Sequence, residues 1–237
     1  ILSIIGAGNS TISIEHNALY DQQTIAVVVI ESLSISTLSN SMEVGETQQL
    51  SSTANYSNGS TIDANNLATW SSSNESTLSV STSGLVTAVS AGNATITASF
   101  GGLQDSSSSE VYALQSLSVL DLPATLEVGV SQQLGSTANY SNSSTIDASS
   151  LATWNSSNES ILSVSSSGLV TAVSAGNATI TATFDGIQGT ADTEVFSLSS
   201  INITPGAVTL AIDSSQSLTA TGLYTHDSTS NLSSSVT

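Results

Sequence analysis

Two kinds of carboxylate recur at matching places in this sequence and have the type needed for acid–base chemistry. Asp63 and Asp147 each follow the triplet STI, and Glu75 and Glu159 each lie in the tetrapeptide SNES. Two carboxyl groups held about 5–9 Å apart can hydrolyse a glycoside. Nothing in the sequence brings these groups into one cleft, and a working active site is rarely copied in tandem. We therefore expect no catalysis from them.

The two histidines do not complete a catalytic site either. His16 and His226 occupy different places in the repeat pattern described below, and residues 32–199 contain no histidine. A serine nucleophile needs a base and an orienting acid beside it, so a Ser-His-Asp arrangement is impossible within that stretch. The sequence predicts a protein that is not an enzyme, in which both histidines are structural or exposed.

Calcium is the remaining candidate ligand, because it prefers hard oxygen donors. Asp105 and Asp121 lie near one boundary between repeats, and Asp185 and Asp192 lie near the next. These acids are scattered along the chain, and no D-x-D-x-D-G loop occurs. We therefore assign no metal ligands and expect no cofactor, with Ca²⁺ bound between repeats as the alternative.

The charge balance excludes several partners. The 237 residues include 18 Asp plus Glu and no Lys or Arg, which gives a formal net charge of −18 at pH 7. Nucleic acids and anionic membranes are bound through cationic side chains, so we expect neither as a partner. No Lys or Arg is present to pair with a carboxylate, so stability has to come from apolar burial and backbone hydrogen bonds.

Cysteine is absent, which excludes disulfides and thiol chemistry. The longest apolar run, IAVVVI at Ile25–Ile30, has the length of a strand. A membrane-spanning helix needs about 20 apolar residues, so no segment of this sequence is expected to enter a bilayer.

The sequence repeats itself with an offset of 84 residues, as from Leu50 to Leu134 and on to Leu218. Neither end carries the atypical capping repeat of an array, so we expect a window onto a longer polypeptide. The expected parts are the C-terminal part of a repeat at 1–31, complete repeats at 32–115 and 116–199, and the N-terminal part of another repeat at 200–237.

Each repeat has the alternating pattern of half-buried strands. In Thr47–Tyr56 the apolar residues Leu50, Ala54 and Tyr56 fall on one face, and Asn93–Phe100 alternates in the same way. YSNGS and SAGN have the composition of turns. About seven short strands in 84 residues predict an all-β sandwich or small barrel. Further strands are expected at Leu33–Ile35, Leu67–Ser71, Leu78–Val80, Leu85–Val89 and Val111–Leu114.

Three blocks of each complete repeat resemble the bacterial immunoglobulin-like group 2 domain. In the first repeat they are VGETQQL (Val44–Leu50), ATWSSSNESTLSV (Ala68–Val80) and SGLVTAVSAGNATITA (Ser83–Ala98). The second repeat carries VGVSQQL, ATWNSSNESILSV and the third block unchanged. The resemblance implies tandem Ig-like β-sandwich domains without disulfides, of the kind found on bacterial surface proteins, including adhesins, and on phage tails and capsids.

The resemblance also implies roles for four residues. Trp70 and Trp154 are expected in the core, and Gly84 and Gly168 at the turn before the next strand. Family members usually carry some Lys or Arg, so their absence here argues against binding through cationic contacts.

A spacer gains reach from each added copy, whereas an enzyme gains little. We therefore expect a structural segment of a large extracellular or cell-surface protein, either an adhesin stalk or an extracellular fibre. Its partners would be other copies or neighbouring repeats, with any host or surface receptor bound outside this segment. The alternatives are a self-assembling filament or sheath with strand complementation between subunits and a phage tail or capsid decoration. A carbohydrate-binding module would need exposed aromatic platforms.

Glycan attachment is a further expectation for a secreted protein. The triplet N-x-S/T marks an acceptor asparagine, and turn positions such as Asn58 and Asn142 are expected to be accessible. The twelve candidates are Asn9, Asn55, Asn58, Asn74, Asn93, Asn139, Asn142, Asn155, Asn158, Asn177, Asn202 and Asn231.

Overall fold

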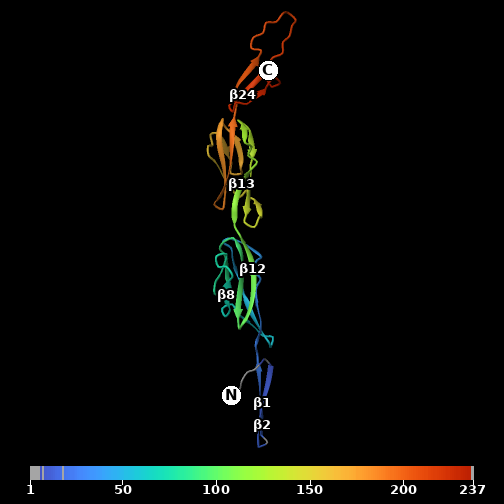
Figure 1. The fold of residues 1–237 in the computed structure, drawn as a ribbon, viewed down its shortest axis with the longest axis vertical. Coiled ribbons are helices and arrows are strands. Elements are labelled where there is room, and N and C mark those ends of the chain that lie inside the picture. Colours follow the sequence, from blue (N-terminus) through green and yellow to red (C-terminus); the bar gives the residue numbers. More distant parts are fainter. Residues whose placement is uncertain (1–5, 7, 18, 236–237) are drawn as a thin grey trace. The chain divides into compact units, whose positions relative to one another are not determined.

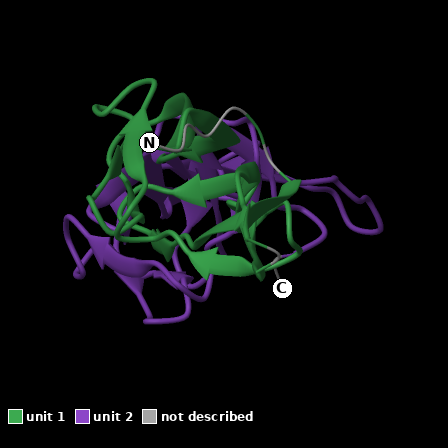
Figure 2. Ribbon diagram, turned by 90° about the horizontal axis from the view of Figure 1, so that it is seen from below, with its two compact units in different colours: residues 1–113 green, residues 114–237 purple. Residues whose placement is uncertain are grey.

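The computed structural model describes residue 6 and residues 8–17 and 19–235, and its regular structure consists of strands (Figure 1). None of these described residues lies in a helix, and so none belongs to a helix that could cross a membrane. The chain divides into two compact units, residues 1–113 and residues 114–237 (Figure 2). Unit 1 ends at Ala113, two residues before the repeat boundary that was expected after Gln115.

Unit 1 starts with an antiparallel hairpin made of β1 (Gly8–His16) and β2 (Leu19–Val27). Three sheets follow, with strand orders β4-β12-β11-β8, β3-β6-β7 and β5-β10-β9. Their strands are β3 (Ile30–Ile35), β4 (Ser41–Glu43), β5 (Thr47–Gln49), β6 (Ser52–Tyr56), β7 (Thr61–Asp63), β8 (Thr69–Ser72), β9 (Leu78–Val80), β10 (Leu85–Ala88), β11 (Gly92–Phe100) and β12 (Leu103–Tyr112).

Unit 2 repeats these three sheets as β14-β22-β21-β18, β13-β16-β17 and β15-β20-β19, and adds a fourth, β23-β24-β25. Its strands are β13 (Leu114–Leu120), β14 (Thr125–Glu127), β15 (Ser131–Gln133), β16 (Gly135–Tyr140), β17 (Thr145–Asp147), β18 (Thr153–Ser156), β19 (Leu162–Val164), β20 (Leu169–Ala172), β21 (Gly176–Phe184), β22 (Ile187–Phe196), β23 (Leu198–Thr204), β24 (Thr219–Tyr224) and β25 (Thr229–Asn231).

The core of each unit lies between its sheets and follows the alternation seen in the sequence. On β11, Ala94, Ile96 and Ala98 are buried while Thr95 and Thr97 face outward. The core of unit 1 draws on the three sheets that follow the β1–β2 hairpin, which makes this part of the unit a sandwich. The prediction of an all-β sandwich without disulfides is therefore confirmed. The largest fully buried side chains are Leu38, Leu50, Leu78, Ile96, Leu134, Leu162 and Ile180.

The stretch expected to form one strand over Thr47–Tyr56 is divided between two sheets. β5 pairs with β10, whereas β6 pairs with β3 and β7. The change of partner falls at Leu50, whose N–H donates to the carbonyl of Gly84 at 2.9 Å. The expected strand at Val111–Leu114 likewise divides at Ala113, between β12 and β13. Each complete repeat has ten strands against the expected number of about seven, because expected strands divide in this way and because β4 and β7 were not expected.

A tryptophan and a glycine meet at the same place in both repeats. Trp70 is buried, Trp154 is half-buried, and each donates its Nε1–H to a backbone carbonyl five residues earlier. Gly84 has φ +81°, and a Cβ there would lie 2.9 Å from Cζ2 of Trp70; Gly168 has the same relation to Trp154. Because both φ and the ring exclude a side chain, glycine is required before β10 and β20, as the resemblance implied.

Ser52 and Ser136 occupy the same place in the two repeats and are both buried. Among the described residues, neither hydroxyl has a hydrogen-bond partner, and the third counterpart of this position is Ala220. Burying an unpaired hydroxyl costs about 1–3 kcal/mol.

Ser136→Ala is therefore expected to stabilise unit 2 by about 1 kcal/mol, measured by urea unfolding. Ser150→Ala, at an exposed turn, is the control, and a less stable Ser136→Ala protein would contradict the prediction.

Candidate functional site

The two histidines lie in surroundings that do not suit catalysis. His16 ends β1, is exposed, and has its Nε2 3.2 Å from Nδ2 of Asn17. His226 is half-buried against Phe196, with ring centroids 4.2 Å apart, and its Nε2 lies 3.0 Å from Oγ of Ser228. The polar partners of the two rings are an amide and a hydroxyl, and neither is a carboxylate that could orient the ring as a base.

The recurrent carboxylates bind the backbone of their own turns. Asp63 accepts the N–H of Asn65 at 2.9 Å, and Asp147 accepts that of Ser149 at the same distance. Glu75 accepts the N–H of Val80 at 3.3 Å, and Glu159 is bonded likewise in the second repeat at 3.2 Å. These contacts give the four carboxylates a structural task, which is to close loops between short strands.

Asp147 has the clearest electrostatic environment among these carboxylates. The hydroxyl of Ser149 donates to Asp147 Oδ1 at 2.5 Å. This bond, and then the N–H of the same serine, lowers the pKa of Asp147 below its usual 3.8.

Elsewhere, burial and then the charges of Glu43 and Glu46 raise the pKa of the Tyr112 phenol. The phenol therefore stays neutral at physiological pH and is not available as a nucleophile.

Ser149→Ala is expected to raise the pKa of Asp147 back toward its ordinary value, because the hydroxyl is the largest cause of the shift. A carboxylate with a lowered folded pKa stabilises the native state above its unfolded pKa. That contribution is lost as the pH falls through the folded pKa. An NMR titration of the side-chain carboxyl measures the change, with Ser150→Ala as the control. An unchanged pKa in Ser149→Ala would contradict the assignment.

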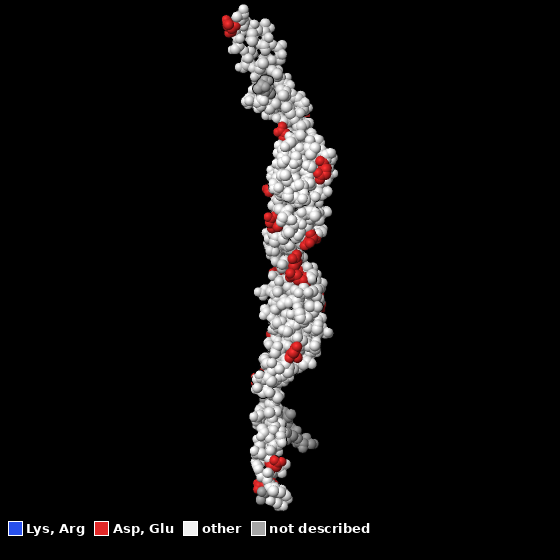
Figure 3. Space-filling view, turned by 180° about the vertical axis from the view of Figure 1, so that it is seen from behind, with Lys and Arg blue, Asp and Glu red and all other residues white. Residues whose placement is uncertain are grey.

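The aspartates considered for calcium near the two repeat boundaries have partners or places within their own units. Asp105 accepts the N–H of Ile35 at 2.8 Å, and Asp192 accepts the hydroxyl of Thr179 at 2.6 Å. Asp121 and Asp185 have positive φ, of 66° and 46°, and so occupy turns. Among the described residues, no three His, Asp or Glu side chains gather closely enough to hold a metal ion. Figure 3 shows the acidic side chains scattered over the face displayed rather than gathered in a single patch.

The two repeats differ at the position of Asp105, and this difference was not predicted from the sequence. Its counterpart is Gly189, where a Cβ would lie 2.2 Å from the carbonyl oxygen of Leu117. In the first repeat a carboxylate bridges β12 to β3, whereas in the second the backbones of β22 and β13 approach each other directly. The exchange of Asp for Gly at matching positions was visible in the sequence as a signal of close approach.

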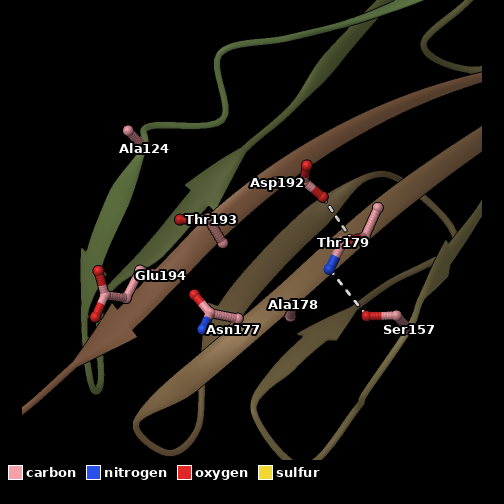
Figure 4. Close-up of a pocket in the computed structure, with 8 residues that line it drawn as sticks. All are labelled: Ala124, Ser157, Asn177, Ala178, Thr179, Asp192, Thr193 and Glu194. Carbon is pink, nitrogen blue, oxygen red and sulfur yellow. Dashed lines mark hydrogen bonds between the residues drawn. The ribbon is translucent and has the colours of Figure 1, made fainter.

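A polar hollow of about 440 Å³ lies on unit 2 and is lined by β21, β22 and two loops. Figure 4 shows Asp192 bonded to Thr179 and Thr179 bonded to Ser157, with Asn177 and Glu194 farther along the same two strands. The lining contains two carboxylates, an amide and hydroxyls but no histidine. Its chemistry suits hydrogen bonding to polar groups and supplies no activated nucleophile.

The outer face of β8, β11 and β12 is a regular array of hydroxyl groups. Thr95 and Thr97 on β11 pair with Ser108 and Ser106 on β12, and Thr97 also pairs with Ser71 on β8. The hydroxyls of Thr95 and Ser108 are 2.8 Å apart. Neighbouring strands lie about 4.8 Å apart, and residues on one face recur about every 6.7 Å along a strand. This face therefore presents hydroxyls with a fixed spacing.

The candidate glycan acceptors differ in exposure. Asn58 is exposed, as expected for a turn, but Asn142 is only partly exposed. Both side chains accept the N–H and the hydroxyl of a serine two residues later. These bonds hold both asparagines in their turns, and Asn142 is less accessible than the sequence predicted.

The comparisons with known proteins place both complete repeats in one family. A model of the bacterial Ig-like domain (group 2) matches residues 29–111 and 113–195. Ice-binding protein 1 of Shewanella frigidimarina (strain NCIMB 400) is 32% identical over 237 residues, which are 98% of this chain and 27% of that protein. The chain therefore spans about a quarter of the length of this relative.

Solved structures with a similar arrangement of strands share little sequence with the chain. Domains 1–6 of the surface layer protein SbsC are 14% identical, with a TM-score of 0.46, over 95% of this chain and 39% of that one. The Escherichia coli adhesin FdeC is 16% identical, with a TM-score of 0.40, over 84% of this chain and 74% of that one.

Proposed function

The chain belongs to the bacterial Ig-like domain (group 2) family, and from that premise we propose that it is a structural segment of a longer surface or secreted protein. The observation that carries the proposal is the pair of near-identical sandwiches whose acidic side chains close their own turns. Repetition of such a unit adds length without adding chemistry. The segment then places another part of the protein away from the cell, as an adhesin stalk or fibre does.

The composition supports an extracellular location. A chain without Lys or Arg offers no site to trypsin-like proteases. A formal charge of −18 favours solubility through mutual repulsion. By the same reasoning, a receptor or surface would be bound by parts of the longer protein outside these 237 residues.

Removing one repeat from the longer protein tests the proposal. Deleting residues 116–199 joins Gln115 to Ser200, the counterpart of Ser116, and keeps the register of the repeat. We expect the purified protein to keep its affinity for its ligand, while attachment of cells through it weakens as repeats are removed. Loss of ligand affinity on deletion would contradict a purely structural role.

A second candidate function is direct contact with ice, and the hydroxyl face of β8, β11 and β12 favours it. The named relative is an ice-binding protein, and a fixed hydroxyl lattice can order water along a crystal surface. The purified chain should then be taken up into a slowly growing ice crystal, and Thr97→Glu with Thr181→Glu should prevent this. Exclusion of the unmodified chain from ice would contradict this second function, and the structural role would be the one that remains.

A further inference from the structure

In each complete repeat, the first and the last strand of the four-stranded sheet lie side by side and run parallel. β4 pairs with β12, so that Ser41 lies opposite Glu110 and Glu43 lies opposite Tyr112. β14 and β22 pair in the same register in the second repeat. The remaining strand pairs of the described residues are antiparallel. Parallel pairing thus joins the beginning of each repeat to its end.

Backbone hydrogen bonds extend this pairing beyond the strands. The N–H of Glu110 donates to the carbonyl of Asn40 at 2.9 Å, and the N–H of Val44 donates to that of Tyr112 at 2.9 Å. The second repeat has the two matching bonds, at 3.0 and 2.8 Å. The paired segments, defined here as the clamp of each repeat, are 40–44 with 110–112 and 124–128 with 194–196.

Apolar side chains bury one side of each clamp. Met42 and Val111 are 2% and 1% exposed, and their counterparts Leu126 and Val195 are 6% and 1% exposed. These side chains belong to the core of their sandwich, so water has to displace packed side chains to reach the clamp from that side. Separating the two strands of a clamp therefore exposes core surface as well as breaking hydrogen bonds.

In the first repeat, side-chain contacts show that the parallel course begins before the clamp. The N–H of Ile35 donates to the carboxylate of Asp105 at 2.8 Å, and the N–H of Leu38 donates to Oγ of Ser107 at 3.3 Å. Residue numbers therefore rise together on the two segments from Ile35 up to the clamp.

The path of the chain decides how a pull acts on the clamp. Ile30, the first residue of β3, lies beside the turn that precedes β12, since a Cβ on Gly101 would lie 2.5 Å from its Cδ1. The chain enters the repeat near the start of β12 and leaves it after Tyr112, at the end of β12. Tension between these points draws 40–44 and 110–112 in opposite directions along their length. Because the two strands have to slide past each other, their bonds share the load, whereas strands opened from one end lose their bonds one at a time.

We propose that the clamp makes each complete repeat a unit that bears tension. The proposal rests on the structural role, because a segment between an anchor and a distant part of a longer protein is pulled from both ends. Resistance to pulling is governed by the unfolding rate, whereas resistance to urea reports the free energy of unfolding. The clamp therefore matters more for the lifetime of a repeat under force than for its stability at rest.

Val44→Pro removes a bond of the clamp with little other change. The N–H of Glu46 donates to the carbonyl of Glu43 at 3.0 Å, and Gly45 has φ +95°. This is the geometry of a type II turn, in which proline is favoured at the position of Val44. Proline also stiffens the unfolded chain, which offsets the loss of one hydrogen bond at equilibrium. Val128→Pro is the same change in the second repeat.

Pulling the purified 237-residue chain at constant force tests the proposal. Val44→Pro should shorten the lifetime of one of the two repeats by about 5–30-fold, the factor that corresponds to the loss of one hydrogen bond. Val128→Pro should shorten the lifetime of the other, and the midpoint of urea unfolding should move little in either variant. Thr82→Pro is the matched control and should leave both lifetimes unchanged. Thr82 is exposed in another turn of the first repeat, closed by the N–H of Gly84 and the carbonyl of Ser81 at 3.0 Å.

Ser107→Ala is a second variant of the first repeat, and it decides the question if Val44→Pro fails to fold. The counterpart of Ser107 is Ala191, so alanine fits this strand, and the change removes the acceptor of the Leu38 N–H. The lifetime of the first repeat should fall, by a smaller factor than in Val44→Pro. Unchanged lifetimes in both variants would overturn the proposal, and so would an equal loss in Thr82→Pro. Neither result would affect the structural role, which deletion of a repeat tests separately.

Discussion

Trp70→Ala is expected to lower the free energy of unfolding of unit 1 by about 3–5 kcal/mol, the range for truncation of a large aromatic core residue. The ring is buried between β8 and the turn at Gly84, and its N–H satisfies the carbonyl of Asn65 at 3.1 Å. Truncation leaves a cavity beside that glycine and an unpaired carbonyl, and both effects act on the same sandwich.

Each complete repeat contains one tryptophan, so the chain carries its own control for this measurement. In Trp70→Ala the remaining fluorescence comes from Trp154 in unit 2. Urea unfolding followed by fluorescence should keep its midpoint, while circular dichroism gains an earlier transition. Trp154→Ala should have a smaller effect, because that ring is only half-buried. A shift of the Trp154 transition in Trp70→Ala would show that the units do not fold independently.

Gly189→Ala is expected to destabilise unit 2 by about 3 kcal/mol or more, the upper part of the range for overpacking. The added Cβ would lie 2.2 Å from the carbonyl oxygen of Leu117. The backbone fixes the position of a Cβ and the oxygen is itself a backbone atom, so no side-chain rotation can move the two apart. β13 would have to shift away from β22, which weakens the closure of the sandwich along the length of both strands.

The matching position in unit 1 provides the comparison. Asp105→Ala adds no atoms and removes the acceptor for the N–H groups of Ile35 and Ser106, so it should cost about 1–3 kcal/mol. Trp154 fluorescence in a Trp70→Phe background reports the Gly189→Ala transition. If Gly189→Ala were no more destabilising than Asp105→Ala, the direct approach of β13 and β22 would be refuted.

The alternation of apolar residues predicted a sandwich or a small barrel, and the resemblance to bacterial Ig-like domains implied the sandwich. The strand Leu78–Val80 was predicted with the bounds that the structure has, and Trp70 was correctly expected in the core. The repeat boundaries at residues 31, 115 and 199 stay predictions.

The features that could not be predicted depend on neighbours far along the chain. The stretch around Leu50 alternates without interruption, so nothing local signals that β5 and β6 join different sheets. Burial of the Ser52 hydroxyl without a partner is decided by how the sheets stack. Candidate ligands such as Asp105 could be recognised in the sequence as acids. Only the fold shows that the carboxylate of Asp105 already accepts the N–H of Ile35.

Pulling the chain from its two ends tests the central claim, which is that each complete repeat is a sandwich that unfolds independently of the other. Single-molecule unfolding of the 237-residue chain should show two main steps. Each should release roughly 26 nm, since about 80 residues extend to at most about 29 nm and a folded sandwich already spans about 3 nm. Deleting residues 116–199 should leave one step of the same length. One step of about twice that length would mean that the two repeats unfold as a single body, and the account of independent repeated sandwiches would be contradicted.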